Sequence, residues 1–265
     1  MPTPYQCLRY QISDSVAEIT LHRPASLNSL NAELLTELRE ALEQTQQDGA
    51  RAVILTGEGR GFCSGADLAD QNLPRDADGL PLLGKSLDDY YHPMLETLYA
   101  LPLPVVHAVN GVAAGAGASI ALAGDIVIAA RSASFKQAFV NIGLVPDASG
   151  TWLLPRLTTR ARAMGMCMLG DSISAEQALA WGMIWQMVED DQLMAEGRSL
   201  AARLAAQPTR AIAAIKTALR SGAQNDLSTQ LDIESRLQTE LGQSQDFIEG
   251  VSAFLEKRPP RFTGR

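Results

Sequence analysis

Alternating and periodic apolar positions predict the first elements of the chain. The segment VAEITLH, residues 16–22, alternates apolar and polar residues as a half-buried strand does. Leucines at helical spacing across residues 32–47 predict a helix, with Asn31 as its N-cap. The apolar run AVILT, residues 52–56, predicts a short buried strand that ends at the turn-forming GEGRG. The first third of the chain is therefore predicted to be strand, helix, strand.

The same alternation of elements continues through the middle of the chain. A helix is expected over residues 95–100, followed by the β-branched strand PVVHAVN, residues 104–110. A glycine-rich loop and a helix of small residues come next, and DIVIAA, residues 125–130, predicts another strand. Strands and helices alternate until about Val188, which favours an α/β core.

Two regions depart from this alternation. Residues 69–85 are irregular and rich in Asp, Pro, Gly and Leu, and connections of this length are usually functional or disordered. Beyond Gln192 the periodicity is helical only, with apolar stripes that need a covering surface, for which a neighbouring subunit is one candidate. We therefore divide the chain into an α/β core with the functional site, residues 1–195, and a C-terminal helical region, residues 196–265.

Composition narrows the class of partner. The chain has 265 residues, 46% of them hydrophobic, and a formal net charge of -8, which argues against general affinity for nucleic acid or anionic membranes and favours a small molecule. The three cysteines are scattered, and the three histidines supply no plausible set of metal ligands. The first residues do not resemble a signal peptide, and no apolar run is long enough to span a membrane. These features predict a cytoplasmic protein with reduced thiols.

Two glycine-rich segments are candidates for binding an anionic group. In GRGFCSGADL, residues 59–68, tight turns would leave main-chain N–H groups free, although an ordinary strand-to-helix turn has the same pattern. In NGVAAGAGASIALAGD, residues 110–125, N–H groups at a helix start could stabilise charge on a ligand oxygen. A dinucleotide site is disfavoured because Ile120 stands where the third glycine should be. Ser119 imitates a hydrolase nucleophile but lacks a suitable histidine base.

A single acid, Asp147, interrupts the sequence GLVPDASGTW. A turn-forming Asp after proline is one interpretation. The other follows from the apolar stretch before it, because a carboxyl group that points inward there would be desolvated, with its pKa above the usual value of about 3.9. A raised pKa suits a base that later returns its proton.

Five blocks in order carry a family resemblance: GRGFCSGADL, NGVAAGAGAS, GLVPDASGTWLLPR, ISAEQALAWGMI and EGVSAFLEKRPPRF. Over nearly the whole chain they resemble the enoyl-CoA hydratase/isomerase (crotonase) superfamily. The resemblance implies an α/β spiral of repeated ββα units, closed by C-terminal helices that form homotrimers or dimers of trimers. It also implies an acyl-CoA thioester substrate, with coenzyme A as part of the substrate and no further cofactor.

The resemblance also assigns site residues. In such enzymes two backbone N–H groups, here those of Ala66 and Ala116, bind the thioester oxygen as negative charge builds on it. Phe254 and Lys257 would approach the nucleotide from a neighbouring subunit. The coenzyme A contacts that it implies are Arg23, Ser64, Ala66, Asp67, Leu68, Phe254 and Lys257.

Departures from the family pattern point to an isomerase. A hydratase of this family uses two glutamates, and the matching positions here hold Ser119 and Phe139, so we expect little or no hydratase activity. Asp147 falls where certain isomerases keep their acid, and one carboxylate suffices to move a proton between two carbons. Dehalogenases use the same acid as a nucleophile, but they usually carry Trp where this chain has Phe139.

Longer runs narrow the resemblance within the superfamily. DDYYHPMLETL, LPLPVVHAVNGVAAGAGA and AFVNIGLVPD resemble the isomerases of phenylacetate catabolism, which convert ring-epoxyphenylacetyl-CoA to oxepin-CoA. Ala66 and the pair Ala148–Ser149 depart from that group beside the acyl chain, and so bear on acyl specificity. Tyr90 and Tyr91 either face a ring substrate or pack in the core. The alternatives are a 3-enoyl to 2-enoyl-CoA isomerase of fatty-acid oxidation and a non-catalytic acyl-CoA-binding protein.

Overall fold

Two β-sheets form the centre of the structure, a computed structural model that describes residues 5–70 and 73–265. The larger sheet has the spatial order β1 (Leu8–Ser13), β2 (Val16–Leu21), β3 (Ala52–Gly57), β5 (Val105–Val109), β7 (Ile126–Ala130), β10 (Gln186–Val188). The smaller sheet has the order β4 (Gly61–Cys63), β6 (Val112–Ala114), β8 (Ser134–Lys136), β9 (Ser172–Ser174). After β1 and β2, which both belong to the larger sheet, each of the next three strand pairs places one strand in each sheet.

This pairing repeats along the chain. In β3–β4, β5–β6 and β7–β8 the first strand extends the larger sheet in parallel and the second extends the smaller one. Helical segments follow each pair: α3 (His92–Ala100), α4 (Ala116–Leu122) and α5 (Gly150–Leu157). Because parallel strands between helices are covered on both faces, they are apolar throughout, and every residue of β3 is buried. The predicted spiral of ββα units is confirmed.

Local signals account for the elements that the sequence predicted correctly. Helix α1 (Ala32–Gln47) begins where the Asn31 side chain accepts a hydrogen bond of 2.9 Å from the Leu34 amide, as expected for its N-cap. The predicted strands at 16–22 and 52–56 are β2 and β3. The antiparallel edge strand β1 was missed because most of its residues face solvent, which leaves no clear apolar alternation.

The irregular segment 69–85 is only partly helical. Residues 71 and 72 lie outside the described residues, and 73–82 form a turn closed by a bridge between Arg75 and Pro81. The short helix α2 (Leu83–Ser86) then leads into a π-helical turn, η2 (Leu87–Tyr91), which continues directly into α3. The helix predicted at 95–100 therefore begins earlier. π-Helical turns are rare and often mark functional sites.

Five further helical elements lie before the C-terminal helices among the described residues. They are η1 (Pro24–Ser26), η3 (Ala138–Ile142), α6 (Arg160–Leu169), α7 (Ala175–Ala180) and η4 (Asp190–Gln192). Helix α8 (Leu193–Ala205) packs on β3 and β5, so the predicted boundary at 195/196 falls inside a helix that covers the larger sheet.

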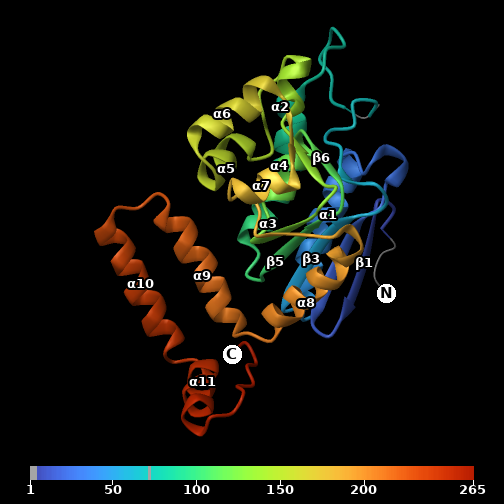
Figure 1. The fold of residues 1–265 in the computed structure, drawn as a ribbon. Helices are drawn as coiled ribbons and strands as arrows, with labels where there is room; N and C mark the ends of the chain where they lie inside the picture. The colour runs from blue at the N-terminus through green and yellow to red at the C-terminus, as the bar shows by residue number, and fades with distance from the viewer. Residues whose placement is uncertain (1–4, 71–72) are drawn as a thin grey trace.

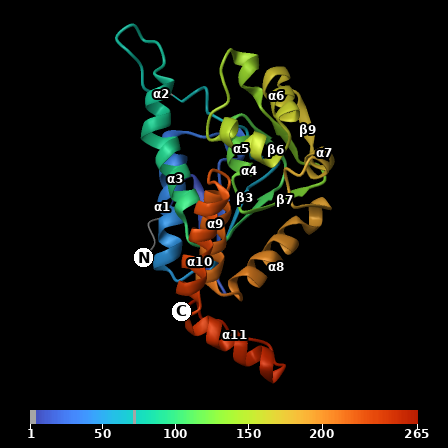
Figure 2. The ribbon, with the colours of Figure 1, turned by 90° about the vertical axis from the view of Figure 1, so that its left-hand side faces the viewer.

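Beyond α8 the chain leaves the two sheets. Helices α9 (Thr209–Gly222), α10 (Leu227–Leu241) and α11 (Gln245–Glu256) form an extension with α11 at its far end (Figures 1 and 2). The three helices border an open apolar groove of about 690 Å³. Large apolar side chains of the extension are exposed: Ile215, Leu219, Leu227, Leu231, Phe247, Ile248, Phe254 and Leu255. Over the residues that the structure describes, no helix is long and apolar enough to cross a membrane.

Candidate active site

Two backbone loops meet between the sheets. One follows β4 and turns at Gly65, with φ +96°, and the other follows β6 and turns at Gly115, with φ +54°. A Cβ atom at Gly65 would lie 2.7 Å from the Ala114 carbonyl oxygen and 3.6 Å from the Ala116 nitrogen. Glycine is required at position 65 for both reasons, since any side chain would be strained and would push the loops apart.

Each of these glycines precedes an alanine with a free amide. Leu30 donates from its N–H to the Gly65 carbonyl oxygen and accepts from the Asp67 N–H, both at 2.8 Å. In this parallel bridge the N–H of Ala66 points away from Leu30. Ala116 is the first residue of α4, where an N–H has no acceptor within the helix. Neither amide donates a hydrogen bond to any described residue.

The two positions that hold glutamates in a hydratase border the same loops. An ideal Cβ at Gly115 would lie 3.8 Å from the Phe139 ring, so this ring lies against the second loop. The Ser119 side chain of α4 is 1% exposed, and its Oγ has no hydrogen-bond partner in the described residues. The same Oγ would lie 2.6 Å from a Cβ at Gly150, three residues after Asp147. Neither side chain can transfer a proton from water.

Asp147 occupies the turn between η3 and α5. Its Oδ1 is buried and makes no hydrogen bond to a described residue, while its carbonyl oxygen accepts from the Gly150 N–H at 2.8 Å. Burial raises the pKa of the Asp147 carboxyl to about 6, against the lowering effects of a hydrogen bond to its own backbone and of His92. Of the two interpretations left open by the sequence, the structure supports the desolvated carboxyl but not the reason given for it, because Val140, Ile142, Leu144 and Val145 of the preceding apolar stretch are exposed. A carboxyl with this pKa can exchange protons near neutral pH.

The backbone beside this carboxyl has an unusual conformation. Ala148 and Ser149 have φ of 47° and 68°, in the left-handed region that residues other than glycine rarely adopt. Each such residue costs about 1–3 kcal/mol and persists only where surrounding contacts hold it. The Ser149 Oγ lies 3.1 Å from the Tyr99 hydroxyl oxygen, within hydrogen-bond range. We call residues 147–150 the Asp147 turn.

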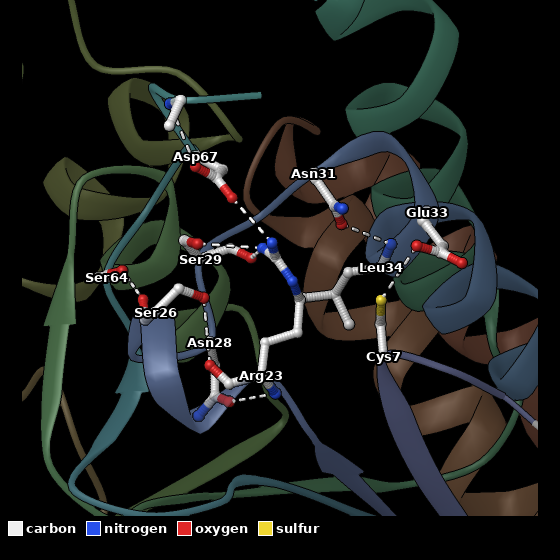
Figure 3. Close-up of polar contacts among 11 residues, drawn as sticks. Cys7, Arg23, Ser26, Asn28, Ser29, Asn31, Glu33, Leu34, Ser64 and Asp67 are labelled. Carbon is white, nitrogen blue, oxygen red and sulfur yellow. Dashed lines mark hydrogen bonds and ion pairs between the residues drawn. The ribbon is translucent and has the colours of Figure 1, made fainter. Parts of the chain in front are cut away.

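A cluster of paired polar groups borders the loop after β4 and is shown in Figure 3. We call it the Arg23 cluster. The Arg23 guanidinium donates to Asp67 Oδ2 at 2.8 Å and to Ser29 Oγ at 3.0 Å, and also to the Ser29 carbonyl oxygen. Ser64 Oγ donates to the Ser26 carbonyl oxygen at 2.9 Å. The hydrogen bond from Arg23 lowers the pKa of Asp67. The cluster comprises Arg23, Ser26, Ser29, Ser64 and Asp67.

The predicted coenzyme A contacts divide into two groups. Arg23, Ser64 and Asp67 lie close to Ala66, but the Arg23 and Asp67 side chains bind each other, the Ser64 hydroxyl donates to the Ser26 carbonyl oxygen, and Leu68 is 75% exposed. Because these side chains already have partners, contacts from this segment to coenzyme A would have to come from backbone amides and carbonyls that are not used within the protein. Phe254 lies in the last turn of α11 and Lys257 is the residue that caps it, and α11 stands at the end of the extension, away from the two sheets (Figures 1 and 2). One chain does not bring them to the site, and their approach from a neighbouring subunit stays a prediction.

The structure distinguishes between the neighbouring tyrosines Tyr90 and Tyr91. Tyr91 is 5% exposed, whereas Tyr90 is half-buried, and both contact the core. The pKa of Tyr91 is raised first by burial and then by the negative charge of Asp147, which places its phenol within electrostatic range of that carboxylate. Tyr99 was not predicted at all, and no local pattern marks a residue whose partner lies 50 positions away.

The other candidate residues have structural roles. His107 is fully buried, its Nδ1 lies 3.1 Å from the Ala121 carbonyl oxygen, and burial lowers its pKa to about 4, as expected for a core residue. His22 pairs with Glu58. All three cysteines are free. Within residues 5–70 and 73–265 no three His, Cys, Asp or Glu side chains are grouped to hold a metal ion.

Fold and sequence together define the class. The model of the enoyl-CoA hydratase/isomerase family matches residues 11–265, and the chain belongs to this family, the crotonase superfamily of enzymes. Its similarity to the 1,2-epoxyphenylacetyl-CoA isomerase of Escherichia coli is 53% identity, over 96% of this chain and 97% of that protein. A protein of Rhodobacter capsulatus named "Probable enoyl-CoA hydratase" is 54% identical, over 98% of this chain and 99% of its own length.

Solved structures agree with this assignment. The enoyl-CoA hydratase of Bacillus anthracis superposes with a TM-score of 0.91 at 33% identity, covering 98% of this chain and 100% of that chain. The names of the relatives support an acyl-CoA isomerase or hydratase activity for the chain.

Proposed function

We propose that this enzyme is an acyl-CoA isomerase in which Ala66 and Ala116 bind the thioester oxygen and Asp147 transfers the proton. One observation carries the proposal. Ser119 of α4, the helix that begins at Ala116, lies against Gly150 of the Asp147 turn, and among the described residues neither the Asp147 Oδ1 nor the Ala66 and Ala116 amides have a hydrogen-bond partner. The hydratase positions hold Ser119 and Phe139 instead of glutamates.

The proposed reaction is a proton transfer between two carbons. The two N–H groups stabilise negative charge that develops on the thioester oxygen when a neighbouring C–H bond breaks. The Asp147 carboxylate accepts that proton, and the resulting acid returns it to another carbon of the acyl group, so the double bond moves. The atoms balance within the substrate, and the reaction uses no cofactor beyond the coenzyme A of the thioester itself.

We further propose a ring-epoxyphenylacetyl-CoA as the substrate and an oxepin-CoA as the product, as in phenylacetate degradation. In this reaction the C–C bond between the two epoxide carbons breaks as the ring double bonds shift, which gives the seven-membered ring, and Asp147 moves a proton from the carbon beside the thioester to a ring carbon. The relative in Escherichia coli named 1,2-epoxyphenylacetyl-CoA isomerase supports this choice. The buried ring of Tyr91, within electrostatic range of Asp147, would form an aromatic wall for such an acyl group. A 3-enoyl to 2-enoyl-CoA isomerase is the second candidate, because a single carboxylate also suffices for that reaction.

The C-terminal extension supports a homo-oligomer, a trimer or a dimer of trimers. Its exposed apolar side chains and open groove need a covering surface, and a second copy of the chain would supply one. In such an assembly Phe254 and Lys257 would reach the nucleotide bound to a neighbouring subunit.

Replacing the acid tests the proposed function. Asp147→Asn should lower kcat by about a hundred- to ten-thousand-fold, the usual value of general acid–base help. Calorimetry with a non-reactive acyl-CoA should show nearly unchanged affinity. In the unaltered enzyme kcat should rise with pH through about 6, since the carboxylate form is the base.

The assay would use ring-epoxyphenylacetyl-CoA, a 3-enoyl-CoA and a 2-enoyl-CoA in parallel. Asp48→Asn serves as a control, because Asp48 binds the Tyr10 hydroxyl at a distant surface. Full turnover by Asp147→Asn would place the base elsewhere, and coenzyme A ester binding without turnover of any substrate would identify a binding protein.

A further inference from the structure

The strained backbone after Asp147 requires a contact that holds it. Ala148 and Ser149 are both left-handed, and neither is a glycine. Ala148 is 3% exposed, and the Ser149 carbonyl oxygen accepts from the Leu153 N–H at 2.8 Å, which ties the turn to the start of α5. These contacts leave the side chain of Ser149 free to bind another element.

The contact to the Ser149 side chain comes from Tyr99 on α3. The two hydroxyl oxygens are 3.1 Å apart, and the Tyr99 ring packs edge-on against Trp152 of α5, with ring centroids 5.9 Å apart. Tyr99 is largely buried, and burial raises its pKa, so the phenol is protonated and can donate at neutral pH. Tyr99 therefore contacts the Asp147 turn through its hydroxyl and the following helix α5 through its ring.

Helix α9 of the extension fixes Tyr99 from the other side. The Arg220 guanidinium lies 5.1 Å from the centre of the Tyr99 ring, donates to the Tyr99 carbonyl oxygen and pairs with Asp125 at 3.1 Å. One helical turn earlier, Lys216 donates to the carbonyl oxygens of Leu101 and Leu103 at 2.9 and 2.6 Å. Lys216 is 9% exposed and also pairs with Asp125 at 2.6 Å. The end of α3 is thus held by two buried or half-buried cations.

We propose that Tyr99 is a positioning residue for Asp147: its hydrogen bond to Ser149 holds the left-handed turn that aims the carboxylate, and Arg220 of α9 holds Tyr99. The inference rests on the proposed role of Asp147 in proton transfer. It makes the extension part of the catalytic geometry, because the chain of contacts Arg220, Tyr99, Ser149 runs from α9 to the Asp147 turn without a break.

The test compares two substitutions that break the hydrogen bond with one that removes the need for it. Tyr99→Phe and Ser149→Ala should each lower kcat about tenfold with KM unchanged, because small displacements of a catalytic group have large effects on rate. The double variant should be no slower than either single one. Ser149→Gly should retain most of the activity, since glycine adopts the left-handed backbone without strain. In the Ser149→Gly background, Tyr99→Phe should then have little further effect.

A structural role alone would not produce this pattern. Tyr10→Phe is the matched control, because it removes a phenol that binds Asp48 at 2.8 Å outside the site, and it should leave kcat unchanged. The second readout is the pKa of the Asp147 carboxyl, followed by carbon NMR of labelled aspartates in Ser149→Ala. Since His92, whose charge lowers the pKa of Asp147, is unchanged in every variant, a shifted titration would report a moved carboxylate.

The outcomes separate this inference from the proposed function. Turnover by Asp147→Asn would overturn the proposed function, whatever Tyr99 does. Suppose instead that Asp147→Asn is inactive, that Tyr99→Phe and Ser149→Ala have the same kcat as Tyr10→Phe, and that the Asp147 titration does not move. This result would overturn the positioning role alone. The positioning role would also be overturned if Tyr99→Phe lowered kcat equally in the unaltered enzyme and in the Ser149→Gly variant. If Tyr99→Phe fails to fold, kcat and the Asp147 titration in Ser149→Ala decide between the outcomes.

Discussion

The Arg23 cluster, which borders the loop that contains Ala66, and the Asp147 turn, which borders α4 at Ser119, differ in whether their polar groups are paired. In the Arg23 cluster the guanidinium, the Asp67 carboxylate and the Ser64 hydroxyl all have partners. In the Asp147 turn a carboxylate oxygen has no partner within the described residues, and the backbone is left-handed at two positions. Paired groups of this kind fix a loop, whereas unpaired and strained groups are typical of reacting sites.

The difference shows that the two sides contribute different things to the same site. A carboxylate that is already paired holds its charge and can shape the loop, but it is a poor base. A carboxylate whose charged form is destabilised by burial gains from accepting a proton. Asp67 therefore positions the amide of Ala66, and Asp147 is the group suited to react.

The largest effect should come from separating the two loops that lie between these regions. In Gly65→Ala the new Cβ would be strained at φ +96° and would lie 2.7 Å from the Ala114 carbonyl oxygen. The Ala66 and Ala116 amides would move apart, and losing one such donor typically lowers kcat by about a hundred- to a thousand-fold. Steady-state kinetics on the best substrate of the panel would measure this.

Gly49→Ala is the matched control for Gly65→Ala. Gly49 has φ +73° but nothing within 4 Å of its ideal Cβ, so the substitution adds backbone strain without a clash. It should lower the free energy of unfolding by about 1–2 kcal/mol and leave kcat unchanged. Equal kinetic losses in both variants would show that strain, and not the contact between the loops, sets the activity.

Neutralising Asp67 and neutralising Asp147 should change the free energy of unfolding in opposite directions. Asp67→Asn removes the partner of a largely buried Arg23 and should lower the free energy of unfolding at neutral pH by about 1–3 kcal/mol. Asp147→Asn removes a buried charge, and the Oδ1 atom of that carboxylate has no partner among the described residues. The substitution should therefore raise the free energy of unfolding by about 1–2 kcal/mol. Urea unfolding at pH 7.5 would measure both.

The pH dependence follows from the directions of the two pKa shifts. The folded pKa of Asp147 is raised to about 6, so ionisation destabilises the fold as pH rises through 6, and the advantage of Asp147→Asn should vanish below about pH 4. The pKa of Asp67 is lowered, so its contribution is present above its ordinary value of about 3.9 and is lost at lower pH. Destabilisation by Asp147→Asn at pH 7.5 would contradict the assigned environment.

What the sequence could predict differs between these regions for a physical reason. Apolar periodicity and the Asn31 cap are local signals, and they placed α1, β2 and β3 correctly. The apolar stretch before Asp147 pointed to a desolvated carboxyl for the wrong reason, because Val140, Ile142, Leu144 and Val145 are exposed, and the burial of Asp147 comes from other parts of the fold. Edge strand β1 and the π-helical turn η2 leave weak or no periodic signals, and both were missed.

The pairing of side chains was beyond sequence reasoning because it depends on contacts between distant segments. Arg23 and Asp67 were both predicted near coenzyme A, but nothing in their surroundings in the sequence shows that they bind each other across 44 positions. The hydrogen bond between Tyr99 and Ser149 is equally non-local, and Ser149 gives no sign of a left-handed backbone, since that conformation is usually marked by glycine.

The smallest expected effect compares one serine from each region. Ser64→Ala removes a hydroxyl that donates at 2.9 Å to the Ser26 carbonyl oxygen, and should lower the free energy of unfolding by about 0.5–1.5 kcal/mol. Ser119→Ala removes a buried hydroxyl that has no partner among the described residues, so it should be neutral or stabilising by up to about 1 kcal/mol. We also expect Ser119→Ala to keep its kcat, because the proposed proton transfer does not use this hydroxyl.

Urea unfolding of the two variants side by side would measure this difference, with the same assay for kcat. If Ser119→Ala destabilised the protein as much as Ser64→Ala, the Ser119 hydroxyl would have to be satisfied by an ordered water, because buried polar atoms without a protein partner are usually solvated in this way. A fall in kcat without a fall in stability would instead place Ser119 against the reacting acyl group. The side of the site that contains Asp147 would then hold two functional polar groups, and the contrast with the paired Arg23 cluster would become sharper.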